Sequence, residues 1–504
     1  MRLSGIRTPD REASSRRTRQ RGSCPQAIEI TREPKWHGLC FRLGDMQVGH
    51  SAHIAPTATP GYARRRPENT VLYSIVQGHL ATLLDAARDR SEQGFGYPRF
   101  VEREFEKFLA CGLLCHGFVR VRCDTCAEER LVAFSCKTRG FCPSCTSRRM
   151  ASTGADLVDR VLPVVPYRQW VLSLPRRVRF LLARDTDLLS QALGVFLGKL
   201  FAWQRRRARA HGIADPQGGA VTFVQRFGSM LNLNCHAHAL LPDGVFAAGS
   251  DGAVRFHPLP PPWDDDVARL LGKVARAIHR LVERRLAQGS DDEPPDLLAS
   301  EQAQAIAGPP LPHRAPGPRS TSRRSAFLDG YSLHADHFID ANDRDGLDRL
   351  CRYGARSPVA NARLSLDPTG RVVVSLKRPL RDGRTALAFT PLDFLRRLAA
   401  LIPPPRSHLT RYHGVFAPNH HLRAAIVPSA APEQPAAAPR RWLNWADLLK
   451  RVFAIDVLVC DSCGGSMRIL AVLPEGEASR AILEHLGLPT EPPPRAHATR
   501  SPIW

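Results

Sequence analysis

Two histidines separated by one apolar residue, His236-Ala237-His238, are the residues of this chain best arranged for chemistry. They fall in the second of two apolar, β-prone runs, Val221–Phe227 and Cys235–Leu241. Because strand side chains alternate between the two faces of a sheet, His236 and His238 should project together and Ala237 should point away. Two imidazoles on one face can bind a single divalent cation. Two unrelated histidines are the alternative interpretation.

Four cysteines have the spacing of a zinc site. Cys123-x2-Cys126 is followed, after fifteen residues, by Cys142-x2-Cys145. Two such turns can close a tetrahedral thiolate shell with no open position, which is typical of structural zinc. We therefore predict one structural Zn²⁺ bound by Cys123, Cys126, Cys142 and Cys145. The alternative ligands nearby are Cys111, Cys115, His116 and Cys136.

Disulfides are a second explanation for these cysteines, and the amino-terminal sequence argues against them. Met1–Arg32 is rich in arginine and lacks the apolar core of a secretory signal. We therefore expect a reducing compartment, in which disulfides are rare. A later pair, Cys460-x2-Cys463, forms half of a zinc site without an evident partner, so its role is left open.

The charge of the chain indicates a polyanionic partner. The 504 residues carry a formal net charge of +23, with 71 Lys and Arg against 48 Asp and Glu. Arginine suits bidentate phosphate contacts, and charge spread along the chain favours an extended polyanion over a small acidic ligand. The arginine bias of a GC-rich genome explains part of the excess. The main basic clusters are Arg16–Arg21, Arg64–Arg66, Arg176–Arg179, Arg205–Arg209, Arg319–Arg324 and Lys377–Arg384.

Composition and periodicity divide the chain into five parts. Residues 1–66 form a basic segment that we expect to be disordered, and residues 67–150 form a zinc-binding DNA-recognition domain with two amphipathic helices. Residues 151–427 form the main domain, interrupted by a Pro-, Gly- and Ser-rich insert at about 288–324 that we expect to be disordered. Residues 428–440 are a linker, and 441–504 are a C-terminal segment with the late cysteine pair.

A metal beside a polyanion suggests phosphoryl chemistry, which needs a nucleophile. Tyr353 lies in an expected helix that Pro358 ends. The apolar face of this helix is traced by Leu347, Leu350, Cys351 and Gly354. Arg352 and Arg356 are neighbours that could bind a phosphate. A tyrosine at the margin of a core helix, with its hydroxyl in water, is the other interpretation.

A second tyrosine competes for this role. Tyr412, in Arg411-Tyr412-His413-Gly414, is also preceded by an arginine that could contact DNA.

Several motifs in one order resemble the rolling-circle transposases of bacterial insertion sequences, specifically the insertion-sequence-ninety-one family. The resemblance covers roughly Pro67 to Leu488. The matching stretches are GFVRVRCDTC, LVAFSCKTRGFCPSC, LNCHAHALLPDGVF, LCRYGARSPVANARLSL, RYHGVFAPNHHLR and CDSCGGSMRIL.

This resemblance implies an HUH nuclease, in which two histidines lie on a central strand and a tyrosine lies on a nearby helix. His236 and His238 match the histidines and Tyr353 matches the tyrosine. The positions four before and four after Tyr353 are Arg349 and Ser357, so the chain resembles the single-tyrosine branch. Strand transfer would then use one tyrosine twice or a tyrosine of a second protomer, so self-association is one of two alternatives. The third metal ligand is not fixed by spacing; its candidates are Gln225, His420 and His421.

The resemblance further implies an α+β fold: an N-terminal helical and zinc-knuckle domain, then an antiparallel HUH-type sheet flanked by helices, then the small C-terminal segment. Mg²⁺ or Mn²⁺ would polarise the scissile phosphate. Tyr353 would attack it to give a 5′-phosphotyrosine and a free 3′-hydroxyl. Arg352, Arg356 and Arg411 would bind DNA, mainly as single strands or hairpin ends. We expect a cytoplasmic, nucleoid-associated bacterial protein with no membrane partner.

Three other functions fit part of the sequence. A non-enzymatic zinc-dependent DNA-binding regulator accounts for the cysteines and the charge, and only the histidine pair with Tyr353 argues against it. A metal-dependent nuclease with three carboxylates is possible in principle, but no pattern singles out such a trio. An inactive transposase remnant is the third, because mobile elements accumulate damage.

Overall fold

The computed structural model describes residues 64–288, 296–307, 323–380, 382–428 and 458–499. The expected disordered segment 1–66 and the linker 428–440 lie almost entirely outside the described residues. Within the described residues the fold is the mixed α+β fold that the sequence predicts, with zinc-type cysteines near the amino-terminal end and antiparallel sheets after them. No helix in this part of the chain is long and apolar enough to span a membrane.

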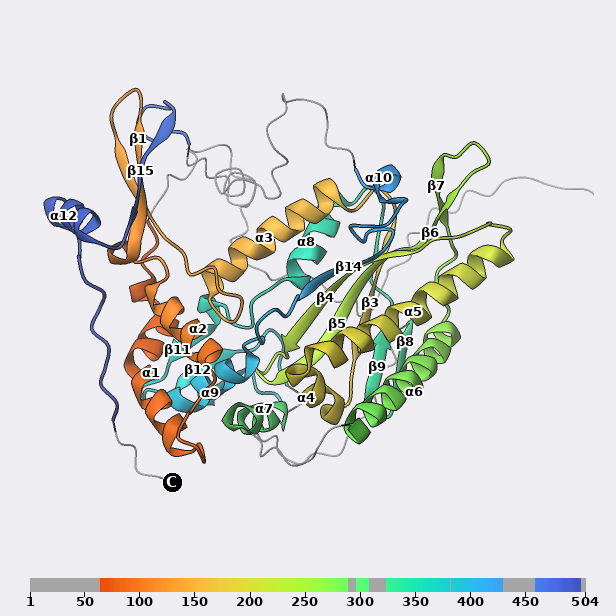
Figure 1. The fold of residues 1–504 in the computed structure, drawn as a ribbon, viewed down its shortest axis with the longest axis horizontal. Helices are drawn as coiled ribbons and strands as arrows, with labels where there is room; N and C mark the ends of the chain where they lie inside the picture. The colour runs from red at the N-terminus through yellow and green to blue at the C-terminus, as the bar shows by residue number, and fades with distance from the viewer. Residues whose placement is uncertain (1–63, 289–295, 308–322, 381, 429–457, 500–504) are drawn as a thin grey trace, which may run out of the picture. The chain divides into compact units, whose positions relative to one another are not determined.

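A seven-stranded antiparallel sheet forms the centre of the main domain (Figure 1). Its order is β14-β4-β5-β3-β9-β8, and β10 pairs with β3. Two neighbouring interior strands, β4 and β5, are buried along almost their whole length, which accounts for their continuous apolar sequences. The bounds are β3 Tyr167–Ser173, β4 Gly219–Phe227, β5 Leu233–Pro242, β8 Ser325–Leu328, β9 Tyr331–His334, β10 Phe338–Ile339 and β14 Thr410–Gly414.

Three helices cover one face of this sheet, namely α4 (Arg176–Arg184), α5 (Thr186–Ala210) and α6 (Asp264–Gln288). Asp185 caps α5, because its carboxylate accepts hydrogen bonds from the backbone N–H groups of Asp187 and Leu188. The apolar stripes of α5 and α6 pack against Ala237 and Ala239 of β5, whose small side chains allow close approach. This face is covered by a largely hydrophobic core.

The opposite face carries α3 (Pro143–Arg160) and α8 (Arg344–Gly354), which pack on each other. Glycine makes the close packing of α8 possible at two points. A Cβ on Gly354 would lie 2.5 Å from the ring of Phe223 on β4, and one on Gly154 would lie 2.6 Å from a carboxylate oxygen of Asp348. The end of α8 is therefore held directly against β4.

A second hydrophobic core joins the amino-terminal helices to a later part of the chain. It contains a three-stranded sheet of order β11-β12-β13 and the helices around it. The bounds are α1 Val71–Asp89, α2 Arg99–Ala110, α7 Leu297–Ala307, β11 Leu364–Leu366, β12 Val372–Ser375, β13 Ala386–Phe389 and α9 Pro391–Leu401. The smaller elements are η1 Pro67–Asn69, η2 Leu114–His116, η3 Asn361–Arg363, α10 Arg423–Ile426 and the hairpin of β6 Gly244–Ala248 and β7 Val254–Pro258.

The prediction that the insert at about 288–324 is disordered is wrong for the middle part of the insert. Residues 297–307 form α7, which packs against α9 and buries Glu301 and Gln302. The helix has apolar residues on all sides, so it lacks the one-sided pattern by which an amphipathic helix is recognised. Residues 289–295 and 308–322 of the insert lie outside the described residues.

The C-terminal segment is not separate from the amino-terminal zinc region. Strand β15 (Met467–Pro474) pairs antiparallel with β1 (Gly117–Cys123), and β2 (Glu129–Ala133) pairs with the other edge of β1. Helix α12 (Glu477–His485) follows β15 and buries Leu483 beside Phe118 of β1. One sheet is thus built from both ends of the described chain (Figure 1). A division of the chain into consecutive domains cannot show that β15 pairs with β1.

Candidate functional site

His236 and His238 project from the face of β5 that is covered by α3 and α8, while Ala237 packs into the core of the other face. The alternation predicted from sequence is therefore confirmed. Their rings lie 4.9 Å apart between centroids. Gln225 of β4 is directly opposite His236 in the antiparallel register, so its side chain belongs to the same face.

Hydrogen bonds orient both imidazoles. Nδ1 of His236 lies 2.8 Å from the backbone oxygen of Asn234, so Nδ1 carries the proton and Nε2 keeps its lone pair. Nδ1 of His238 lies 3.1 Å from the side-chain amide of Gln169 on β3. Nε2 of His238 is buried and has no hydrogen-bond partner among the described residues. A buried, unpartnered ring nitrogen beside a second free one is what a metal ligand pair requires.

Both histidines are neutral. Burial lowers the pKa of His236 to about 4; the hydrogen bond to Asn234 opposes this shift, and the positive charges of Arg356 and Arg179 add to it. Burial, followed by His236 and Arg356, holds the pKa of His238 well below its ordinary value. Neutral imidazole is the form that binds metals, so no proton competes for these nitrogens near neutral pH.

Tyr353, near the end of α8, meets His238 directly. The two rings are edge to face, with centroids 5.8 Å apart and planes at 82°. The amide nitrogen of Gln225 donates hydrogen bonds to the backbone oxygens of Tyr353, at 2.8 Å, and Gly354, at 3.1 Å. These carbonyls are at the helix end, where no intrahelical donor remains for them. Gln225 therefore fixes the tyrosine relative to the histidine strand.

Two cations lie against the tyrosine ring and a third, Arg363, interacts with both of them; we call Arg356, Arg363 and Lys377 the Arg356 cluster. The guanidinium carbon of Arg356 lies 4.6 Å from the ring centre of Tyr353, and Nζ of Lys377 lies 5.9 Å from it. Burial, then Arg356 and Arg363, lowers the pKa of Lys377. No ion pair within the described residues neutralises these three groups. Concentrated positive charge without a carboxylate partner is suited to an anion such as a phosphate.

Arg352 and Arg411, both predicted to bind DNA, are not brought to the histidines. Arg352 forms an ion pair of 2.6 Å with Asp348, one turn earlier on α8. Arg411 donates a hydrogen bond of 2.7 Å to the hydroxyl of Ser190 on α5, which covers the opposite face of the sheet. Of the three predicted DNA-binding arginines, only Arg356 has its guanidinium against the ring of Tyr353.

The competing tyrosine, Tyr412, is on the edge strand β14 and packs in the core under α3. Burial, and next the carboxylate of Asp156, raise its pKa to about 12. A half-buried phenol beside a carboxylate, with a raised pKa, is a poor nucleophile for a phosphate.

The other candidates for the third metal ligand do not join the site. His420 and His421 stack on each other, with ring centroids 4.6 Å apart. None of their described contacts reaches His236 or His238.

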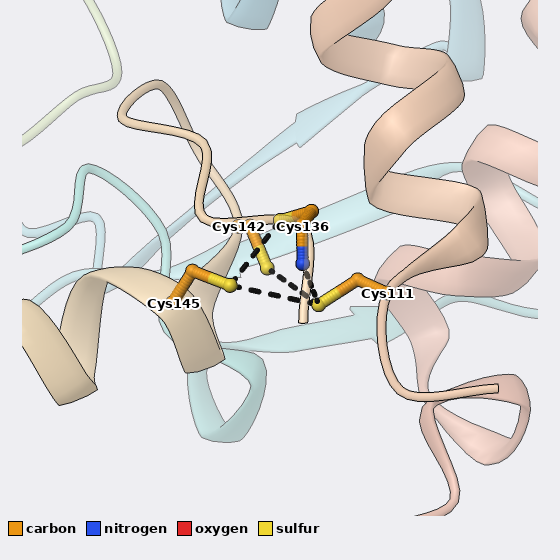
Figure 2. Close-up of side chains that lie close together, drawn as sticks. All are labelled: Cys111, Cys136, Cys142 and Cys145. Carbon is orange, nitrogen blue, oxygen red and sulfur yellow. Dashed lines mark hydrogen bonds between the residues drawn. The ribbon is translucent and has the colours of Figure 1, made fainter. Parts of the chain in front are cut away.

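The cysteines form two groups of four, and the predicted ligand set is wrong. Cys142 and Cys145 meet Cys111 and Cys136 (Figure 2), whereas Cys123 and Cys126 meet Cys460 and Cys463. In the first group the Sγ–Sγ distances include 3.6 Å for Cys111–Cys145 and 3.7 Å for Cys111–Cys142. Zinc–sulfur bonds of about 2.3 Å in a tetrahedron put the sulfurs roughly 3.8 Å apart.

The predicted and observed ligand sets differ because of where Cys123 and Cys126 lie in the fold. Cys123 ends strand β1, whose hairpin with β2 extends away from α2, whereas Cys142 and Cys145 lie at the start of α3, close to the end of α2. Cys111 directly follows α2, so it is the nearer partner. The cysteine spacing is typical of zinc, but it does not identify which pairs share an ion.

Two family models match this chain. One, described as "Putative transposase", matches residues 219–423, which include both histidines and Tyr353. The other, described as "Transposase zinc-binding domain", comes from the insertion-sequence-ninety-one transposases and matches residues 84–174. These matches support an insertion-sequence-ninety-one-family transposase. No curated protein and no solved structure matches the chain.

The matches support a transposase function, imply DNA binding and suggest an enzyme that acts on DNA. The zinc-binding match contains the whole group of Cys111, Cys136, Cys142 and Cys145, and together they support structural zinc. The cysteine pair at 460 and 463 lies outside both matched ranges.

Sequence reasoning missed three residues of the site. Gln169 contacts His238, and Arg363 and Lys377 complete the Arg356 cluster. Lys377 belongs to a basic stretch that was noted for its charge alone. A glutamine on a buried strand next to the histidine strand is a signal that could have indicated Gln169, because buried amides need partners.

Proposed function

We propose that this transposase nicks and rejoins single-stranded DNA at the ends of an insertion sequence through a 5′-phosphotyrosine on Tyr353. The observation that carries the proposal is the contact between Tyr353 and His238, with His236 beside them on the same strand face. A regulator that only binds DNA has no need for a tyrosine ring against two neutral, partly unpartnered imidazoles.

The residues present fit a divalent cation, which we propose to be Mg²⁺ or Mn²⁺. His236 and His238 would bind it through Nε2, provided that Gln169 turns its amide oxygen toward Nδ1 of His238 and accepts the proton there. Among the described residues, no group of three His, Cys, Asp or Glu side chains includes either histidine. Gln225 is therefore the proposed third ligand, through its amide oxygen, because it faces His236 across the strands. The cation would replace the guanidinium of Arg356, which donates a long hydrogen bond of 3.4 Å to that oxygen. A cation bound there would polarise the scissile phosphate and offset the charge that develops on it.

The nicking step is a direct displacement at phosphorus. The phenol oxygen of Tyr353 loses its proton and bonds to phosphorus, while the bond from phosphorus to the 3′ oxygen breaks and that oxygen takes up a proton. The Arg356 cluster would bind the non-bridging oxygens and stabilise the charge of the transition state. Joining is the reverse reaction with another 3′-hydroxyl. The covalent bond keeps the phosphodiester energy, so neither step consumes ATP.

A single tyrosine serves this site in our proposal. The positions four before and four after Tyr353 are Arg349 on α8 and Ser357 beyond its end, and Tyr412 is half-buried elsewhere, under α3. Complete strand transfer then uses Tyr353 twice or the tyrosine of a second copy of the chain. Both routes share the same first covalent intermediate.

The polarity of the adduct tests this function. The full-length protein is incubated with Mn²⁺ or Mg²⁺ and a single-stranded element end that is labelled at either its 3′ or its 5′ terminus. We expect the 3′ label to move with the protein on denaturing gels and the 5′ label to appear in a shorter strand that a polymerase can extend. DNA binding without any adduct would favour the regulator or an inactive remnant. An adduct that carries the 5′ label would contradict the 5′-phosphotyrosine.

A further inference from the structure

We propose that Cys123, Cys126, Cys460 and Cys463 bind a second structural zinc ion, which fastens the C-terminal strand β15 to the amino-terminal strand β1. These residues are brought together from opposite ends of the described chain, because Cys123 and Cys463 are 340 positions apart. The zinc-binding family match ends at residue 174 and so contains only half of this set.

The four sulfurs are arranged as in a tetrathiolate site. Sγ of Cys123 lies 3.5 Å from Sγ of Cys463, Sγ of Cys126 lies 3.5 Å from Sγ of Cys460, and all four sulfurs lie within 4.8 Å of one another. A disulfide would hold two sulfurs about 2.05 Å apart. The sulfurs are therefore separate thiols at distances that suit a common ion, for which tetrahedral zinc needs roughly 3.8 Å.

The two cysteine turns have the same backbone structure. Ala127 donates its backbone N–H to the oxygen of Cys123 at 3.2 Å, and Gly464 donates to the oxygen of Cys460 at 2.8 Å. The residue after the second cysteine has a positive φ in both turns, 61° at Ala127 and 71° at Gly464. Two identical turns with their sulfurs facing one point form a pseudo-symmetric pair of zinc knuckles.

A second set of bonds closes each turn at its other end. The N–H of Cys123 donates to the oxygen of Glu128, and the N–H of Cys460 donates to the oxygen of Gly465, both at 2.8 Å.

Backbone N–H groups also point at the sulfurs, as expected for thiolates. Thr125 donates its N–H to Sγ of Cys123, and Gly465 donates its N–H to Sγ of Cys463, both at 3.4 Å. A Cβ on Gly465 would lie 2.4 Å from the hydroxyl of Thr125 and 3.1 Å from Sγ of Cys123, so only glycine lets the two turns come this close. Such donors stabilise the negative charge that four thiolates around Zn²⁺ carry.

Contacts around the site show what the ion would fasten. Asp124 donates its N–H to the oxygen of Ser466 at 2.9 Å, and ion pairs join Arg468 to Asp124 and Arg130 to Asp461. Beyond them, β15 continues along β1, but many of its side chains are exposed. Little apolar area holds β15 in place, so a metal ion that closes a very long loop would supply the missing stability.

Metal analysis of the full-length, reduced protein tests the inference. We expect two zinc ions per chain in the wild type and one in the double variant Cys460→Ser/Cys463→Ser. The control Cys115→Ser, a buried cysteine of the same region that belongs to neither group, should retain two. Two zinc ions in the double variant, one in the wild type, or iron in place of zinc would overturn the proposal.

A conservative variant covers the case in which the double variant does not fold. Cys463→His keeps a ligand, so it should still bind two metals per chain. After replacement of zinc by Co²⁺, its visible absorption should differ from that of the wild type, because one thiolate has been replaced by an imidazole. An unchanged cobalt spectrum would overturn the assignment of Cys463. A Cys123–Cys463 disulfide in peptide maps of the unreduced protein would do the same.

Discussion

The ring of Tyr353 stands edge-on to the ring of His238, with centroids 5.8 Å apart, although the two residues lie on a helix and a strand that are more than a hundred positions apart. Gln225 holds this arrangement, because it donates to the last carbonyls of α8 from the strand next to the histidines. The guanidinium of Arg356 and the ammonium of Lys377 also lie close to the ring of Tyr353. A phosphate between the histidine pair and these cations would therefore face the tyrosine.

Replacing His236 and His238 together by Ala should abolish nicking of single-stranded DNA and leave binding largely intact. The histidines would act on one phosphate, whereas affinity comes mainly from basic residues elsewhere. Gel shifts and nicking assays with Mn²⁺ measure the two effects separately. The matched control is the double variant His420→Ala/His421→Ala, which removes another pair of neighbouring histidines and should nick normally. Normal nicking by the 236/238 variant would exclude an HUH site, and failure of that variant to fold would show a purely structural role.

Arg356→Met should reduce the nicking rate by roughly 100-fold or more, which is typical when one donor to transition-state charge is removed. Methionine retains apolar contact with Phe227, over whose ring the guanidinium lies at 4.9 Å. Arg349→Ala is the control on the same helix, because Arg349 is exposed and forms only a long ion pair with Asp343. Equal single-turnover rates for the two variants would contradict a role for the Arg356 cluster.

Gln225→Met should destabilise the protein by about 1–3 kcal/mol, because the carbonyl of Gly354 loses the donor from Gln225 and that of Tyr353 keeps only the long bond, 3.4 Å, from the N–H of Arg356. It should also slow nicking, since Tyr353 loses its support. Thr222→Val on the same strand is the matched control: its buried hydroxyl has no partner among the described residues, so its loss should cost little. Chemical unfolding and single-turnover nicking measure both effects. A Gln225→Met protein with wild-type stability and rate would show that the amide bonds do not matter.

Cys142→Ser should remove one zinc ion and destabilise the amino-terminal region. Its sulfur lies among those of Cys111, Cys136 and Cys145, which join the end of α2 to the start of α3. Removal of one ligand leaves an incomplete tetrahedral shell. Metal content and limited proteolysis are the measurements. Full zinc content and unchanged proteolysis would show that this group is not a zinc site.

The sequence predicts those features of the fold that depend on local pattern. The continuous apolar runs predict β4 and β5, and the alternation of His236, Ala237 and His238 correctly predicts which face each occupies. Helix α8 and its tyrosine follow from the spacing of Leu347, Leu350 and Cys351, although the helix ends at Gly354 rather than at Pro358.

Features that depend on long-range pairing could not be predicted. The partner of Cys123 is hundreds of residues away, and the nearer pair at 142 and 145 has equally suitable spacing, so spacing alone selected the wrong ligands. Lys377 reaches the tyrosine, and Arg363 reaches Lys377 and Arg356, only because the sheet of β11, β12 and β13 is packed nearby. Helix α7 was missed because it lacks an amphipathic pattern and lies within a stretch rich in Pro and Gly.

The most direct test of the central claim is the covalent adduct formed by Tyr353→Phe. Phenylalanine keeps the ring against His238 and removes only the oxygen that we propose attacks phosphorus. With Mn²⁺ and end-labelled single-stranded DNA, the wild type and Tyr412→Phe should both form an adduct, which peptide mapping should place on Tyr353. Tyr353→Phe should bind DNA and zinc as the wild type does and form none. An adduct that survives in Tyr353→Phe, or one that maps to Tyr412, would contradict this account.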